Sequence, residues 1–583
     1  MRNQKNHKQG YLFDPWAHLG PKRRKLLEDS WAGLFREHVL TELPVDEIAP
    51  FFKDDFGRPT KELYMMMGAV LLQQVHDLTD EETVDQVAFS EQWRYALNIT
   101  SDSDEAAYIC PKTLYNMHRI FINNNIHESV FNKITDKLAR AFDVDVTKQR
   151  IDSKHIKSDM ARLGRIGLMV KTISKFLVNL KRQRRELFDG LPEELVKKYM
   201  SEKERSCFSM VKPSESANTL ASVAQDLFEL SMHFAGNEQV TAMTSFQLLL
   251  RVLHEQCKVT ENDAGEPVEV EPRPCKDVPA DSLQNPSDPE AGYDSHKGQG
   301  YQVQVMETYS DEEDPDKKAQ ELDLITYIEV EPACEHDSSA LMPAIESTQE
   351  RGLGPDEVLA DSHYGGDENV AAAAEAEVEL IAPAMGTKKK DKLGLDEFEF
   401  TEEGEVSKCP AGHAPVKNKT NKKKGRHSAA FNSDVCADCP HAAQCPAQRG
   451  KKHHYLRYSD KELRLARRRQ EEKTPAFKDR YRRRSGVEAT MSDFDRMTNI
   501  KRLRVRGRPA VCFCAFLKAA GVNIFRATKA KAARKAKNPA PPGPVAPFSR
   551  PFYAFKELVP SIIRESTNLL FPTTPQVIIS PGK

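Results

Sequence analysis

The chain has 583 residues, of which 30% are charged and 8% are aromatic, and its formal net charge is −2. This length exceeds one ordinary hydrophobic core, so we expect two or three domains with insertions. The longest apolar run, Leu63 to Leu72, is too short to cross a bilayer, and the first residues, MRNQKNHKQG, lack the apolar stretch of a secretory signal. We therefore expect a cytoplasmic protein that does not act in a membrane.

Charge is distributed unevenly along the sequence. Residues 451–540 contain 27 Lys and Arg against 8 Asp and Glu, whereas residues 261–316 are strongly acidic. Such a basic segment attracts polyanions. Tyr455, Tyr481 and Phe494 are interleaved with the cations, and Gly507 permits close backbone approach, so the pattern favours a nucleic-acid surface over a merely solvated face.

Residues 1–143 are predicted to form an all-helical domain. Leu63, Met67 and Leu71 recur at helical spacing, and Thr79 stands three residues before Glu82, the pattern of a capping box at a helix start. The pattern does not identify a helix that reads DNA.

Alternating strands and helices are predicted in the middle of the chain. Residues 144–162 hold a first strand with Asp152, and residues 163–292 hold a helical insertion that ends in an exposed acidic linker. Residues 293–400 hold the remaining strands, with helices from about Ser339 and Asn369, and Asp361 ends one strand before the turn SHYGG. The predicted strands are Gly300–Thr308, Leu324–Val330, Asp356–Asp361 and Glu379–Pro383. This order predicts an α/β fold with a ribonuclease H-like mixed sheet.

Residues 401–450 form a Cys-rich insertion. The eleven cysteines of the chain are an odd number, which does not favour a disulfide framework. Cys409 is followed by Cys436, Cys439 and Cys445, with one CxxC pair among them. Four thiolates suit a closed structural Zn²⁺ site, so we expect a small zinc knuckle. His413 or His441 could replace one of the four ligands. The alternative is that the cysteines are free thiols in a loop.

Residues 451–530 are predicted to be basic helices, and residues 531–583 a basic, Pro-rich tail without assigned chemistry. Tyr481, Arg484 and Glu488 are spaced to project from one helix face. A carboxylate among so many cations stays ionised and is suited to holding a divalent metal beside a polyanion.

The spacing Tyr-x2-Arg-x3-Glu of these three residues resembles the signature of bacterial insertion-sequence transposases of the Asp-Asp-Glu (DDE) superfamily. RIDSKHIKSD around Asp152 and VLADSHYGG around Asp361 resemble the first and second acidic positions of that family. The family continues with a Lys seven residues after the Glu; here this position is Asp495, and Arg496 follows on nearly the same helix face. The helical N-terminal segment and the Cys-rich insertion also resemble parts of such transposases.

The resemblance implies that Asp152, Asp361 and Glu488 are the catalytic acids and hold Mg²⁺ or Mn²⁺, and that double-stranded DNA is the partner. Convergence of three carboxylates makes physical sense where divalent cations bind. His155 and His363, each close to a candidate acid in sequence, are candidates for positioning water or phosphate, surface histidines being the alternative. The expected DNA contacts are Tyr481, Arg484, Arg496, Lys501, Arg504 and Lys297.

The predicted function is therefore a DDE transposase that binds the terminal inverted repeats of its element, cleaves DNA and transfers strands, with at least a dimer on DNA. Two alternatives remain from sequence alone. One is a catalytically idle DNA-binding repressor or architectural protein, and the other is a ribonuclease H-like nuclease without strand transfer.

Overall fold

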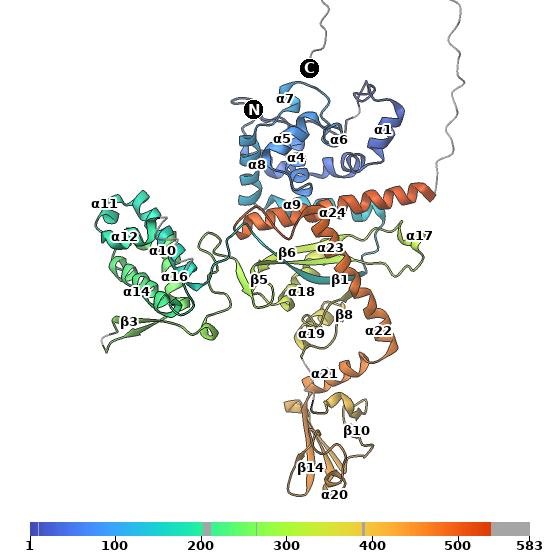
Figure 1. Ribbon diagram of the computed structural model, residues 1–583. Helices are drawn as coiled ribbons and strands as arrows, with labels where there is room; N and C mark the ends of the chain where they lie inside the picture. The colour runs from blue at the N-terminus through green and yellow to red at the C-terminus, as the bar shows by residue number, and fades with distance from the viewer. Residues whose placement is uncertain (10, 202–210, 264, 387–390, 538–583) are drawn as a thin grey trace, which may run out of the picture. The chain divides into compact units, whose positions relative to one another are not determined.

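The computed structural model describes residues 1–537 apart from 10, 202–210, 264 and 387–390 (Figure 1). Its first part is entirely helical, because apolar residues recur there at helical spacing. The expected capping box is present: Thr79 Oγ1 accepts from the backbone N of Glu82 (3.2 Å), and Glu82 Oε2 accepts from the backbone N of Thr79 (2.7 Å). The helices are α1 (Pro21–Glu28), α2 (Trp31–Leu34), α3 (Val45–Ile48), α4 (Leu63–Val75), α5 (Asp80–Phe89), α6 (Glu91–Ala96), α7 (Asp104–Ala107), α8 (Pro111–Asn123) and α9 (Ile126–Phe142).

A mixed six-stranded sheet follows. Its strands are β1 (Lys148–Ile156), β4 (Gly292–Asp294), β5 (Gly298–Thr308), β6 (Ile325–Pro332), β7 (Glu357–Leu359) and β8 (Glu379–Ile381). The order across the sheet is β6-β5-β1-β7-β8, with the short β4 paired to the start of β5. β5 runs antiparallel to β1 and β6, whereas β7 runs parallel to β1 and β8. The predicted strands are all present, although β7 stops two residues before Asp361.

Helices cover both faces of this sheet. Ile151, Met306 and Val358 pack against α18 (Leu341–Glu350) and α19 (Asp367–Glu375). Val303 and Val305 face the other way and share a core with the N-terminal helices, α23 (Gly486–Thr498) and α24 (Arg508–Lys537). The sheet is thus the middle of three layers, with residues distant in sequence joined in one core.

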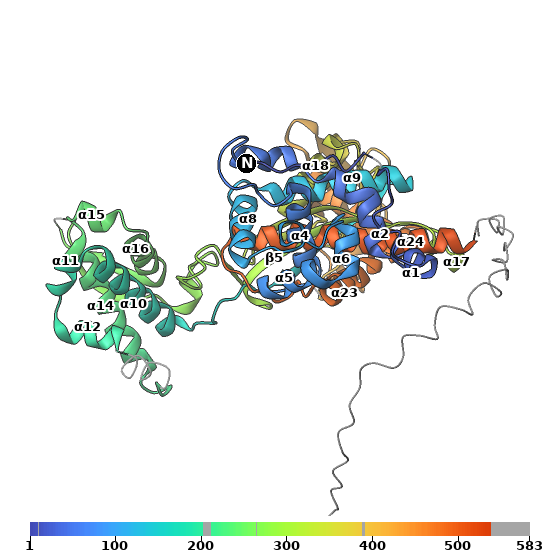
Figure 2. The same ribbon diagram turned by 90° about the horizontal axis from the view of Figure 1, so that it is seen from above.

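The insertion after β1 is helical, as predicted, with its own apolar core. Its helices are α10 (Arg165–Gln183), α11 (Arg185–Asp189), α12 (Glu193–Met200), α14 (Ser216–Phe234), α15 (Glu238–Thr241) and α16 (Thr244–Gln256), and Figure 2 shows them grouped together. The segment expected to be only an exposed linker instead begins with a hairpin, β2 (Cys257–Glu261) and β3 (Pro267–Pro272). Val259 and Val270 pack against the helical core, which explains why so polar a segment is ordered.

The Cys-rich insertion is a small β unit with an apolar core, although most of its residues are polar. A core of seven buried residues includes Phe398, Phe431 and Leu456. Its elements are β9 (Glu399–Phe400), β10 (Val406–Lys408), β11 (Lys417–Asn421), β12 (Arg426–Asn432), α20 (Ser433–Ala437), β13 (Gln448–Arg449) and β14 (His453–Ser459), and the four-stranded sheet has the order β11-β12-β14-β13.

The basic segment that follows is not one continuous helix. It consists of α21 (Asp460–Glu471), α22 (Pro475–Tyr481), a 3-10 turn over Arg482–Ser485, and α23. Arg150 Nη1 donates to the carbonyl O of Arg483 (2.9 Å), and a Cβ on Gly486 would lie 2.1 Å from the same nitrogen. The turn therefore packs directly on the guanidinium of Arg150. Because the turn separates α22 from α23, Tyr481 and Glu488 lie on two different helices.

Helix α24 is long and apolar enough to cross a membrane by composition alone, and 72% of its most apolar window is buried inside the protein. Cys514 is buried there. Helix α24 continues to Lys537, into the segment predicted to be a basic, Pro-rich tail, and the rest of that segment lies outside the described residues.

Candidate active site

Strand β1 carries Asp152 on the sheet face that meets α23. Asp152 pairs with Val305 of β5, and residues directly opposite each other in an antiparallel pair share a face. Asp152 Oδ1 accepts from the backbone N of Ser153 at 2.9 Å. Because side chains alternate along a strand, His155 points to the opposite face, where its ring lies against Gly300. The structure therefore does not bring His155 to Asp152.

Asp361 reaches the same point from the neighbouring strand. Arg150 pairs with Leu359 in the parallel β1–β7 ladder, so continuing that register by two residues sets Asp361 beside Asp152. The turn after β7 is held by the backbone N of His363, which donates to Asp361 Oδ1 at 2.8 Å. A Cβ on Gly365 would lie 2.0 Å from the carbonyl O of Pro383, so this turn requires glycine.

Arg484 joins the three predicted acids. Its Nη2 lies 2.8 Å from Asp152 Oδ2 and 3.9 Å from Asp361 Oδ2, and its Nη1 lies 3.3 Å from Glu488 Oε1. Arg484 and Asp152 are 18% and 16% exposed, whereas Glu488 is 70% exposed. One guanidinium thus holds together carboxylates from β1, from the turn after β7 and from α23.

A buried ionic network fixes the base of α23. Glu307 of β5 is fully buried and accepts from Arg150 Nε (2.7 Å), from Arg526 Nη1 (2.8 Å) and from Thr490 Oγ1 (2.7 Å). Thr490 stands two residues after Glu488. A buried carboxylate with three donors is satisfied, and it ties β1, β5, α23 and α24 together below the three acids.

The electrostatics of the site disfavour an ionised Asp152. Burial raises the pKa of the Asp152 carboxyl to about 6, Arg484 opposes this shift, and the charges of Asp361 and Asp337 add to it. Burial, together with Asp337, Asp152 and Asp361, also raises the pKa of Tyr364 well above its usual value. The negative charge of Asp152, Asp361 and Asp337 therefore exceeds the positive charge of the Arg484 guanidinium.

The other predicted DNA contacts lie apart from this centre. Arg496 is 69% exposed and pairs with Asp493 rather than with any of the three acids, and Arg504 is 56% exposed and pairs with Asp77. Lys501 and Lys297 are exposed. Tyr481 lies closer, stacked on Phe477 with ring centroids 5.6 Å apart, and its burial raises its pKa.

Asp495 stands where the family has Lys, and the cation beside it is Lys154 of β1. Asp495 Oδ2 lies 3.9 Å from Lys154 Nζ, and Lys154 Nζ donates to the carbonyl O of Met491 at 2.5 Å. Lys154 shares the face of β1 with Asp152. The amine beside α23 thus comes from β1, and sequence spacing within α23 gave no signal for it.

Sequence reasoning also missed Asp337 and its contact with His363. Asp337 begins the 3-10 turn Asp337–Ala340, five residues after the end of β6, and its Oδ2 lies 3.5 Å from His363 Nδ1. A signal was available, since Asp337 follows one strand of the sheet much as Asp361 follows another.

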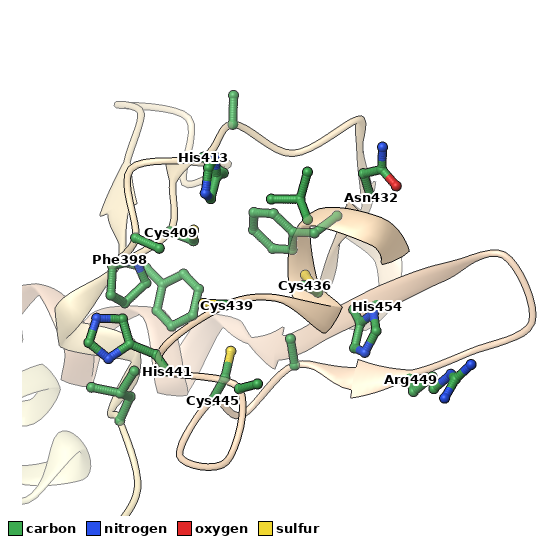
Figure 3. Close-up of a pocket in the computed structure, with 18 residues that line it drawn as sticks. Phe398, Cys409, His413, Asn432, Cys436, Cys439, His441, Cys445, Arg449 and His454 are labelled. Carbon is green, nitrogen blue, oxygen red and sulfur yellow. The ribbon is translucent and has the colours of Figure 1, made fainter.

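The four predicted zinc ligands line one cavity of about 410 Å³ (Figure 3). Cys409, Cys436, Cys439 and Cys445 all carry free thiols, and His413, His441 and His454 line the same cavity. Burial raises the pKa of Cys436, and the neighbouring thiols add to the shift. The four thiols are therefore close enough to act on one another's charge.

Neither centre has completed metal geometry: within the described residues, no three Cys, His, Asp or Glu side chains are arranged to hold an ion. The donor types nevertheless fit different metals. The first centre offers carboxylate oxygens, which suit Mg²⁺ or Mn²⁺, and the second offers thiols and imidazoles, which suit Zn²⁺.

Two segments of the chain match known protein families. Residues 29–115 match a transposase domain (DUF772), and residues 408–528 match the transposase DDE domain. The second segment contains the four clustered cysteines and Glu488, whereas Asp152 and Asp361 lie outside both matches. No curated protein matches the chain. The two domain matches support an insertion-sequence transposase of the DDE class.

Proposed function

We propose that the protein binds the terminal inverted repeats of its insertion sequence and catalyses Mg²⁺-dependent DNA cleavage and strand transfer. The observation that carries this proposal is the gathering of Asp152, Asp361 and Glu488 around Arg484. The sheet order β6-β5-β1-β7-β8, in which β5 alone runs opposite to the other four strands, supports a ribonuclease H-like core. The transposase domain matches support the reaction class.

In this mechanism Asp152, Asp361 and Glu488 would hold divalent cations beside the scissile phosphate. When bound, such ions would supply activation of the attacking oxygen and stabilisation of the leaving oxygen in an in-line displacement. Water is the nucleophile when the end of the element is cut, and the 3′-hydroxyl so released attacks target DNA when strands are joined. Arg484 offsets the carboxylate charge in the protein alone and is positioned to donate to a phosphate oxygen once cations take over that role.

The proposed DNA surface extends from this centre along the basic C-terminal segment. Arg496, Lys501 and Arg504 leave cationic groups at the surface there, and Lys297 does so in the turn between β4 and β5. Phosphate contacts of this kind hold a duplex in register without reading its sequence. The N-terminal helices are proposed to contribute to end binding, and pairing of two ends requires at least a dimer.

We also propose a structural Zn²⁺ at the cysteine cavity, with Cys409, Cys436, Cys439 and Cys445 as ligands. Four thiols around one cavity support this assignment. Because the unit has an apolar core of its own, the ion would fix the loops that carry the cysteines rather than fold the whole unit. We propose residues 401–450 as the boundaries of this unit.

We also propose that the protein acts in the cytoplasm, associated with the nucleoid when it is bound to DNA.

The test is cleavage and joining of DNA that carries the ends flanking the gene, in the presence of Mg²⁺. Asp152→Asn, Asp361→Asn and Glu488→Gln should each abolish cleavage and joining while DNA binding persists. Asp493→Asn on α23 is the matched control and should cut like the wild type, because Asp493 pairs with exposed Arg496 and with no other cation among the described residues. Binding without cutting by the wild type would favour an idle DNA-binding protein, and cutting without joining would favour a nuclease.

A further inference from the structure

Asp337 enters the carboxylate centre from the helical layer opposite α23. It follows β6 and opens the turn that leads into α18. Its side chain is only 12% exposed, although it is a charged residue in a surface turn. Sequence gave it no role, and the mechanism above does not use it.

Two contacts fix the carboxylate of Asp337. Gln304 Nε2 donates to Asp337 Oδ1 at 3.2 Å, and His363 Nδ1 lies 3.5 Å from Asp337 Oδ2. His363 belongs to the turn that holds Asp361, and Gln304 is paired across the sheet with Ser153, the neighbour of Asp152. Asp337 is thus anchored to both segments that carry the buried acids.

The anchor itself is rigid. The Gln304 amide is fully used: Oε1 accepts from Tyr364 Oη (2.6 Å), and Nε2 also donates to Glu331 Oε2 (3.0 Å). Gln304 is completely buried. An amide with all these partners has one orientation, so it presents a donor to Asp337 without relying on Asp337 to hold it in place.

Charge is not balanced at this centre. Asp337 has no Lys or Arg within ion-pair distance among the described residues, and its partner His363 is 62% exposed. Asp152, Asp361 and Glu488 share Arg484. Four carboxylates therefore face one guanidinium and one imidazole, and a shielded carboxylate without a cation is costly unless a cation binds.

On the basis of the proposed function, we propose that Asp337 is a fourth carboxylate of the divalent-cation site, oriented by Gln304 and facing His363. His363, which faces Asp337, belongs to the turn whose backbone holds Asp361, so Asp337 lies beside a segment that carries one of the proposed metal ligands. An additional carboxylate raises the affinity of an oxygen-ligand site for hard divalent cations.

The experiment measures Mn²⁺ binding to the full chain by electron paramagnetic resonance titration, without DNA. The variants are Asp337→Asn, which keeps an oxygen acceptor for Gln304, and Glu335→Gln, an exposed neighbour, as the matched control. Asp337→Asn should weaken Mn²⁺ binding by about tenfold or more, the scale for losing a partner of a metal site. Glu335→Gln should bind like the wild type.

Thermal unfolding in EDTA separates a structural role from a metal role. If Asp337 serves the metal, Asp337→Asn unfolds at or above the wild-type temperature in EDTA, since one of four like charges is gone, and gains less from added Mn²⁺. Unchanged Mn²⁺ affinity, or a large loss of stability in EDTA, overturns the proposal.

Asp152→Asn separates this inference from the proposed function. If Asp152→Asn abolishes Mn²⁺ binding while Asp337→Asn leaves it intact, only the role of Asp337 is refuted. If Asp152→Asn binds Mn²⁺ like the wild type, the carboxylate site itself is refuted, and the role of Asp337 is refuted with it.

Discussion

Replacing Arg484 by Gln removes the one cation that three carboxylates share. Most of the effect should come from Asp152, because its oxygen lies 2.8 Å from Arg484 and both side chains are less than 20% exposed. The contact with Glu488 is largely solvated at 70% exposure, and that with Asp361 is long at 3.9 Å, so both contribute little.

Breaking a fully buried pair costs about 3–5 kcal/mol, and the residual exposure here reduces the expected loss to about 2–3 kcal/mol. That loss corresponds to a melting temperature lower by roughly 4–12 °C if the cooperative unit has about 150–250 residues, and by less for a larger unit. The assay is thermal unfolding in EDTA. Arg482→Gln, two residues earlier in the same turn, is the control. It loses ion pairs with Glu313 and Asp479 in which the side chains are 53% and 70% exposed, so it should change stability by less than about 1 kcal/mol.

Divalent cations should reverse the effect of Arg484→Gln. A guanidinium between the acids competes with metal for the same oxygens, so the variant should bind Mn²⁺ at least as tightly as the wild type and gain more stability from it. Equal unfolding temperatures in EDTA, or weaker Mn²⁺ binding by the variant, would refute the reasoning.

Three further predictions concern other parts of the structure. Gly365→Ala should lower both stability and cleavage, since its Cβ would meet the Pro383 carbonyl O at 2.0 Å, whereas Gly366→Ala has open space and should be silent; unfolding and cleavage assays on the pair compare them directly. Burial raises the folded-state pKa of Asp152 to about 6, above its unfolded value of 3.8, so its contribution to stability is present at low pH and is lost as the pH rises through that range. In EDTA, the free energy of unfolding of the wild type should fall by about 2–3 kcal/mol because Asp152 loses its proton as the pH rises from 3.8 to about 6. Asp152→Asn should abolish this fall, and an unchanged pH profile would contradict the raised pKa. Cys436→Ser should lower the zinc content of purified protein, measured by mass spectrometry, while exposed Cys275→Ser should not; a zinc-free wild type would refute the zinc assignment.

The sequence by itself determined the local elements and supplied three candidate acids. Alternation along residues 300–308, the capping box at Thr79 and the short apolar run before Asp361 are local patterns, and each produced the element that it predicted. The order of those elements was enough to select the sheet arrangement, because connections between neighbouring strands follow few topologies. Family resemblance supplied Asp152, Asp361 and Glu488 before any contact was visible.

Only the tertiary structure decided what lies next to these acids. At the break between α22 and α23 the chain contacts Arg150, which is more than 300 residues away in sequence. The periodicity of apolar residues within one segment does not predict such a contact. Lys154 lies beside Asp495 because the face of a strand and the face of a helix meet only in the folded core. The sequence also did not predict the place of Asp337 or the apolar core of the Cys-rich unit. Charge balance and burial depend on which residues are neighbours in space, and the order of residues does not specify those neighbours.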